Sequence, residues 1–278
     1  MARERTPVRR RTGVLTAATA VLALATAATA SAGPLVPPGG PETAASPAAG
    51  APPVLPGLPA LPLRSGALPR GHDVSSHQRG VDWAAARARG ARFVYVKATE
   101  STGYRNPYFS GQYSGARAAG LIRGAYHFAR PDRSSGAEQA AYFVRHGGGW
   151  RADGWTLPPA LDIEYNPYDA KHKCYGVGKA RMVRWIRSFS DEVKERTGRR
   201  PVIYTTTQWW KLCTGNSRAF SSSHALWIAR HGTSQPGALP GGWRYWTFWQ
   251  HAVKGRLPGD QDLFNGSLSR LRIFARDH

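Results

Sequence analysis

Short apolar runs and segments with helical spacing alternate along the chain from residue 70 onward. Residues 93–97 and 121–128 combine β-branched and aromatic side chains, which is typical of strands. Residues 179–196 carry apolar side chains at spacings of three and four and end at Gly198, which predicts an amphipathic helix. By the same criteria, further strands are expected at 157–164, 201–205, 226–229 and 245–251, and further helices at 83–89 (capped by Asp82), 108–119 and 134–145.

This alternation over residues 70–278 predicts a parallel α/β architecture, and a closed or nearly closed barrel is the natural candidate. In such barrels the working residues lie at the carboxyl ends of the strands. Polar residues gather at those ends along the whole chain, namely Lys97, Glu100, Tyr126, Asp162, Glu164, Tyr204, Trp249 and Gln250. Several independent strands therefore deliver functional groups to one rim.

Two carboxylates at the end of the expected strand 157–164 provide the clearest chemical signal. Asp162 and Glu164 are two positions apart, so both project from one face of a strand, roughly 6–7 Å apart along the backbone. In an apolar site one of them is driven toward its protonated form, which a glycosidase requires of its general acid. A pair of solvated carboxylates at a sheet edge is the alternative, and this pattern alone does not separate the two.

The N-terminus predicts export. An arginine-rich opening is followed by an apolar run and by Ala30-Ser31-Ala32, so we expect a signal peptide over 1–32, cleaved after Ala32. A membrane anchor is disfavoured because the run is short, rich in Ala and Thr, and lacks a basic flank on its far side. Residues 33–69 are rich in Pro, Ala and Gly without periodicity, which predicts a disordered linker before a folded domain at 70–278.

The chain is strongly basic, with a formal charge of +21. The predicted leader holds five Arg and one Glu, so the exported chain keeps +17. The basic residues are scattered rather than clustered, and no zinc-finger, RNP or helix-turn-helix signature is present, which argues against nucleic acid as a partner. Attraction to anionic cell-wall polymers and the background of an arginine-rich proteome are the two remaining explanations.

The chain has two cysteines, Cys174 and Cys213. In an exported protein an even pair favours a disulfide, and closing the loop of 38 intervening residues stabilises a fold by roughly 3–4 kcal/mol in the chain-entropy model. A metal site would need more ligands at short spacing, and His72, His77 and His127 lack such spacing. We therefore expect no metal and no other cofactor.

Five segments in order are similar to the motifs of glycoside hydrolase family 25, the Chalaropsis-type lysozymes. They are residues 71–78 (GHDVSSHQ), 96–100 (VKATE), 124–128 (GAYHF), 161–164 (LDIE) and 259–266 (GDQDLFNG), and residues 203–205, 226–229 and 249–250 also fit. The resemblance extends over 71–275 and is closest to secreted actinomycete members, which carry a similar cysteine pair. One departure is Ser101, where members usually have the Gly that eases a tight turn.

The resemblance implies an N-acetylmuramidase that cleaves the β-1,4 bond from N-acetylmuramic acid to N-acetylglucosamine in peptidoglycan. The implied fold is an irregular TIM-like (β/α) barrel with some antiparallel strands near the C-terminus. Glu164 would be the general acid, and Asp162 would stay ionised and stabilise positive charge on the sugar, either by polarising the 2-acetamido group or as a nucleophile. Asp73 and Asp260 match the family's other pocket acids, with structural roles in a turn and in the last loop as the alternative.

The expected substrate-binding residues are Glu100, Lys97, Tyr126, Tyr204, Trp227, Trp249 and Gln250. For the aromatic residues the alternative is ordinary core packing, above all for Trp227 between Leu226 and Ile228. The implied partners are peptidoglycan glycan strands and anionic wall polymers, and a secreted monomer is expected, with no stable membrane insertion after the leader is removed. A non-catalytic glycan-binding barrel is the second hypothesis, although such a binder would be free to lose Glu164.

Overall fold

The computed structural model describes residues 67–277, so the predicted leader and residues 33–66 of the predicted linker lie outside it. The strands of this part are β1 (Arg70–Val74), β2 (Ala91–Glu100), β3 (Tyr104–Arg105), β4 (Ile122–Phe128), β5 (Ala160–Asp162), β6 (Val202–Thr205), β7 (Leu226–Ala229), β8 (Phe248–Ala252) and β9 (Asp260–Phe264). Its α-helices are α1 (Trp83–Ala88), α2 (Phe109–Ala118), α3 (Gly136–Arg145), α4 (Lys179–Thr197), α5 (Thr207–Thr214) and α6 (Leu268–Arg276), and a 3-10 helix, η1, spans Ser76–Gln78. None of these helices is long and apolar enough to cross a bilayer.

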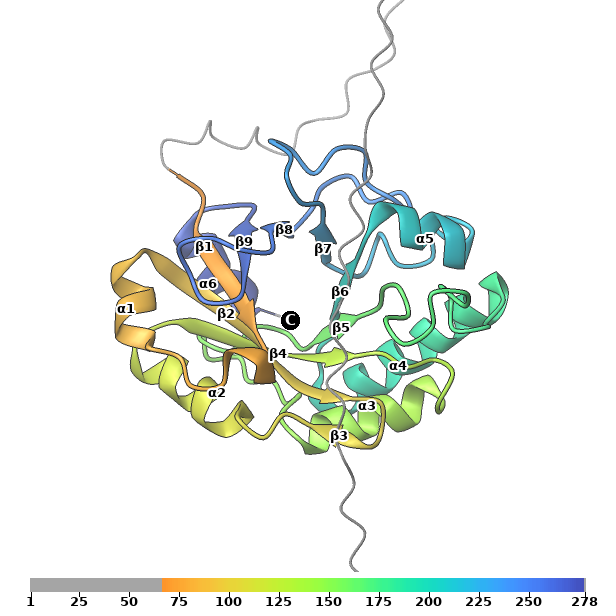
Figure 1. Ribbon diagram of the computed structural model, residues 1–278, viewed down its shortest axis with the longest axis horizontal. Helices are drawn as coiled ribbons and strands as arrows, with labels where there is room; N and C mark the ends of the chain where they lie inside the picture. The colour runs from red at the N-terminus through yellow and green to blue at the C-terminus, as the bar shows by residue number, and fades with distance from the viewer. Residues whose placement is uncertain (1–66, 278) are drawn as a thin grey trace, which may run out of the picture. The chain divides into compact units, whose positions relative to one another are not determined.

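The strands form a closed barrel with helices on its outside (Figure 1). The sheet order is β1-β9-β8-β7-β6-β5-β4-β2-β3, and pairing of β1 with β2 closes the ring, leaving β3 attached to the edge of β2. Neighbouring barrel strands run parallel except around β9, which is antiparallel to both β1 and β8. The expected irregular (β/α) barrel with antiparallel pairing near the C-terminus is therefore confirmed.

Local signals account for most of the helices. Asp82 accepts a hydrogen bond from the backbone N–H of Ala85 at 2.9 Å and caps α1, as expected. Gly198 ends α4 in the left-handed conformation at φ 75°. Ser101 also has positive φ, at 50°, a conformation that favours glycine and costs a serine some backbone strain.

Two layers of side chains fill the molecule. Tyr95, Trp227 and Phe248 lie inside the barrel, with the rings of Tyr95 and Trp227 stacked at 4.8 Å. The strand residues that face outward pack under the helices. In this layer the rings of Phe143 from α3 and Phe189 from α4 stack on each other. Apolar and aromatic side chains therefore fill most of the barrel's interior.

The disulfide between Cys174 and Cys213 is present, and it ties the loop after β5 to α5. We expect the Cys174→Ser/Cys213→Ser variant to lose roughly 3–4 kcal/mol of unfolding free energy, because the bond closes a long loop in the unfolded chain. Thermal unfolding measures this loss. Wild-type protein in a thiol reductant should show the same lowering of Tm, and an unchanged Tm in both samples would show that the bond adds no stability.

Candidate active site

A pocket of about 240 Å³ opens at the carboxyl-terminal rim of the barrel. Each of the eight barrel strands places at least one side chain in its lining. These are Asp73, Lys97, Tyr126, Asp162, Tyr204, Trp227, Gln250 and Asp260, from β1, β2, β4, β5, β6, β7, β8 and β9 respectively. Glu164 joins them from two residues beyond the end of β5. Asp260 reaches the same rim from the start of its strand because β9 runs in the opposite direction.

Four of the lining side chains are carboxyl groups, and the pKa of each is raised. Burial and the Asp260 carboxyl raise the pKa of Glu164 to about 7, and burial and Asp260 likewise raise the pKa of Asp73 to about 7. Burial and the charge of Glu164 raise the pKa of Asp162 well above its usual range, while burial raises that of Asp260. The pocket therefore holds protons near neutral pH that isolated carboxyl groups would have released.

The surroundings of Asp162 oppose the ionised form that the sequence analysis expects of it. Its side chain is only 8% exposed, and its Oδ1 atom has no hydrogen-bond partner among the described residues. The Lys97 ammonium is the one nearby charge that favours its ionised form, and it lowers the pKa of Glu164 as well. Without a donor at Oδ1, burial and Glu164 outweigh that attraction and raise the pKa of Asp162.

Asp73 is held by side chains from across the barrel. Gln250 donates from Nε2 to Asp73 Oδ2 at 2.8 Å, and the Tyr204 hydroxyl donates to Gln250 Oε1 at 3.0 Å. Next to this chain, Gly259 takes φ 76°, and a Cβ at that position would lie 2.0 Å from the Asp73 carbonyl oxygen. A glycine is thus required before Asp260 for β9 to approach β1 so closely.

Asp262, part of the motif at residues 259–266, lies next to this network. It is 1% exposed and accepts a hydrogen bond from Trp227 Nε1 at 2.8 Å, while its Oδ2 atom has no hydrogen-bond partner among the described residues. Burial and the charge of Asp73 raise the pKa of Asp262 well above its usual range. Its spacing of two from Asp260 was the available signal, because the same spacing singled out Asp162 and Glu164.

Because burial raises the pKa of Asp262, we expect Asp262→Asn to keep kcat/KM within about threefold of wild type, since the oxygen of a neutral amide can still accept from Trp227. Asp262→Leu should lose about 1–3 kcal/mol of unfolding free energy by leaving the Trp227 indole N–H unsatisfied, with a larger loss of activity. Hydrolysis of soluble glycan strands and thermal unfolding measure both effects. If the asparagine variant is as impaired as the leucine variant, an ionised carboxylate is needed instead.

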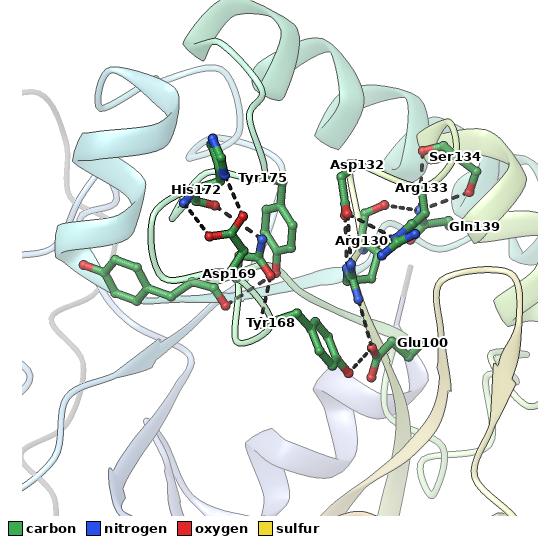
Figure 2. A network of polar contacts seen from close by, with 12 residues as sticks. Glu100, Arg130, Asp132, Arg133, Ser134, Gln139, Tyr168, Asp169, His172 and Tyr175 are labelled. Carbon is green, nitrogen blue, oxygen red and sulfur yellow. Dashed lines mark hydrogen bonds and ion pairs between the residues drawn. The ribbon is translucent and has the colours of Figure 1, made fainter. Parts of the chain in front are cut away.

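Glu100 does not line the pocket but belongs to a polar network with Arg130 and Tyr168 (Figure 2). It accepts from the Tyr168 hydroxyl at 2.5 Å, pairs with Lys97 at 2.7 Å, and lies 3.8 Å from Arg130. The Arg130 guanidinium stacks over the Tyr168 ring at 4.2 Å and is held by Asp132. Glu100 thus lies behind Lys97, where it orients the ammonium that reaches the pocket and anchors the loop carrying Tyr168.

Trp249 and Gln250 are neighbours on one strand and so face opposite ways. Gln250 lines the pocket, whereas Trp249 packs on the outer side near Trp246 and donates from Nε1 to the Arg230 carbonyl at 2.9 Å. The structure therefore does not bring Trp249 into the predicted sugar-binding set. Trp227 lines the pocket, yet it is only 2% exposed, so most of its ring packs in the core. Ser75, His77, Gln78 and Phe128 complete the lining and were not predicted as site residues.

Residues 72–260 match the family described as Glycosyl hydrolases family 25. The chain is 47% identical over 209 residues to the N,O-diacetylmuramidase of Chalaropsis sp., covering 74% of this chain and 98% of that protein, and 46% identical to Lysozyme M1 of Streptomyces globisporus, covering 75% and 71%. The solved structure of a family GH25 lysozyme from Aspergillus fumigatus superposes with a TM-score of 0.74 at 47% identity, covering 76% of this chain and 100% of that one.

Proposed function

Because the chain belongs to glycosyl hydrolase family 25, we propose that it is a muramidase that hydrolyses the β-1,4 bond between N-acetylmuramic acid and N-acetylglucosamine in peptidoglycan. The observation that carries the proposal is the pocket in which Asp73, Asp162, Glu164 and Asp260 converge from different strands. A non-catalytic glycan-binding barrel has no need of crowded, proton-holding carboxyl groups. Their presence favours catalysis over binding alone.

Glu164 is the proposed general acid. It is half-buried and lines the pocket, so its carboxyl group can reach a bound glycosidic oxygen, and its raised pKa keeps it protonated up to about neutral pH. Donation of this proton to the leaving oxygen avoids expulsion of an alkoxide, and general acid catalysis of this kind contributes about 10²–10⁴-fold to rates.

Asp162 is proposed to stabilise the positive charge that develops on the sugar ring. Its Oδ1 atom has no partner among residues 67–277, and a substrate 2-acetamido N–H placed there would supply the missing hydrogen bond. Such a donor favours the ionised carboxylate, so substrate binding would lower the pKa of Asp162 and promote its charged form. This accounts for a buried carboxyl group whose pKa is high in the free protein and whose charge is needed in the transition state.

The remaining lining residues are proposed to bind and orient the glycan. Tyr126 and Tyr204 expose 8% and 7% of their surface, so only their edges reach a sugar ring. The Lys97 ammonium, oriented by Glu100, offsets the negative charge of the carboxyl cluster. We further propose that the protein acts outside the cell as a monomer, where its positive charge raises its encounter rate with anionic wall polymers.

Product analysis tests the proposed reaction. Purified peptidoglycan is digested, and the new reducing ends are identified by mass spectrometry. A muramidase leaves N-acetylmuramic acid at the reducing end. Reducing-end glucosamine would identify the opposite bond specificity, and the absence of any new reducing end would favour the non-catalytic glycan binder.

A further inference from the structure

A second, larger groove lies at the opposite end of the barrel from the active-site pocket. Its volume is about 1220 Å³, and Val202 and Leu226, the first residues of β6 and β7, lie in its wall. Phe264, the last residue of the reversed strand β9, lies there too. Because the active-site residues come from the other ends of these strands, a ligand in this groove leaves the pocket open.

The charged residues that line the groove are mainly cations. They are Lys194, Arg199, Arg200, Arg218, Arg244 and Arg270, whereas Asp277 is the one acidic residue of the lining. Arg200 pairs with Asp191, and Arg199 donates to the carbonyls of Phe274 and Asp277. Arg218, Arg244 and Arg270 are exposed and form no ion pair within residues 67–277.

Hydroxyl groups and one open aromatic ring accompany these cations. Ser221, Ser222 and Ser223 line the groove in succession. Tyr245 is 70% exposed, far more than the tyrosines of the active-site pocket, and it lines the groove together with Arg244. Guanidinium groups bind phosphate oxygens in bidentate fashion, and hydroxyl groups add further donors. An exposed aromatic ring offers an apolar face to the sugar or polyol units between charges.

We propose that this groove is a second binding site, for a wall polymer of phosphodiester-linked polyol or sugar units. The choice of a wall polymer rests on the proposed function, since a peptidoglycan hydrolase works where such polymers are attached. The groove's size suits several consecutive units, and its three unpaired arginines match a ligand with repeated single charges. Binding there would hold the enzyme on the wall while the opposite end cuts glycan strands, which raises the local substrate concentration.

Equilibrium binding to isolated poly(glycerol phosphate) tests this site. The groove variant is Arg218→Gln/Arg244→Gln/Arg270→Gln, in which each change removes one exposed charge from the lining. The matched control is Arg89→Gln/Arg145→Gln/Arg181→Gln. These three arginines are exposed, at the C-cap of α1, on α3 and on α4 respectively, and they line neither cavity. Both variants lose the same formal charge, so the comparison separates the groove from net charge.

The groove variant should bind poly(glycerol phosphate) about tenfold more weakly than wild type, while the control stays within about twofold. Equal weakening of both variants, or no weakening of the groove variant, would overturn the proposal. Tighter wild-type binding to polyglutamate or to duplex DNA than to poly(glycerol phosphate) would overturn the assigned partner. Hydrolysis of phosphate-free soluble glycan strands should be unchanged in both variants. Failure of wild type in that assay would count against the proposed function and not against the groove.

Discussion

Glu164→Gln is expected to lower kcat for glycan hydrolysis by about 10³-fold with KM nearly unchanged, because the amide keeps the shape of the acid but cannot donate its proton. Three other carboxyl groups line the pocket, but each comes from a different backbone position than Glu164, which lies two residues beyond the end of β5. Initial rates on soluble glycan strands measure the loss. Glu195→Gln, at an exposed position of α4 outside both cavities, is the matched control and should retain wild-type rates.

The pH dependence of the rate follows from the same carboxyl group. Burial and Asp260 raise the pKa of Glu164 to about 7, so the fraction of enzyme with a protonated general acid falls as pH rises through about 7. Activity of wild type should therefore decline on the alkaline side of neutrality. A rate that stays constant up to pH 9 would remove Glu164 from the role of proton donor.

The stability of the Glu164→Gln variant separates loss of chemistry from loss of fold. A carboxyl group whose pKa is raised in the folded state makes its full contribution to folding stability when the pH is below its pKa in the unfolded chain. For Glu164 that contribution is lost as pH rises through about 7. Replacing it with a neutral amide should raise Tm at pH 8 relative to wild type and change it little at pH 4. A variant that is inactive yet more stable at pH 8 has lost catalysis and not structure.

Asp162→Asn is expected to lower kcat by about 10²-fold, since the neutral amide cannot stabilise positive charge on the sugar. In the structure Asp162 is buried with one unpartnered oxygen, so its charge acts in a site of low polarity where charge interactions are strong. The loss should be large on N-acetylated glycan strands and small on chemically N-deacetylated strands, which lack the acetamido group. Equal losses on both substrates would contradict a contact between Asp162 and that group.

Much of the site was predictable from strand periodicity. Asp162 and Glu164 lie two positions apart, and this spacing alone places them on one face whatever the surroundings. The same rule, applied to the last motif, would have paired Asp260 with Asp262, and applied to Trp249 and Gln250 it would have excluded one of them from the pocket. Asp262 was missed and Trp249 was included because each motif was interpreted as a whole, whereas alternate residues of a strand face different environments.

Other features depended on contacts that no local pattern encodes. The sequence pattern did not predict α5, α6 or the strands β1, β3 and β9, because their segments are short or rich in polar residues. Glu100 lies near Lys97 in the sequence, yet its partners Arg130 and Tyr168 come from separate loops that only the closed barrel brings together. The sequence predicts a strand over residues 157–164, whereas the observed strand β5 spans only Ala160–Asp162. Its length is set by hydrogen-bond pairing with β4 and β6.

The sequence by itself determined the alternation of strands and helices, the cysteine pair, and the carboxyl groups available for chemistry, since each follows from local spacing and residue type. The tertiary structure alone decided which carboxyl groups share a pocket, how deeply each is buried, and how strongly its pKa is raised. Burial and the distance between charges set those pKa values, and both quantities arise only when strands distant in the sequence close into a ring.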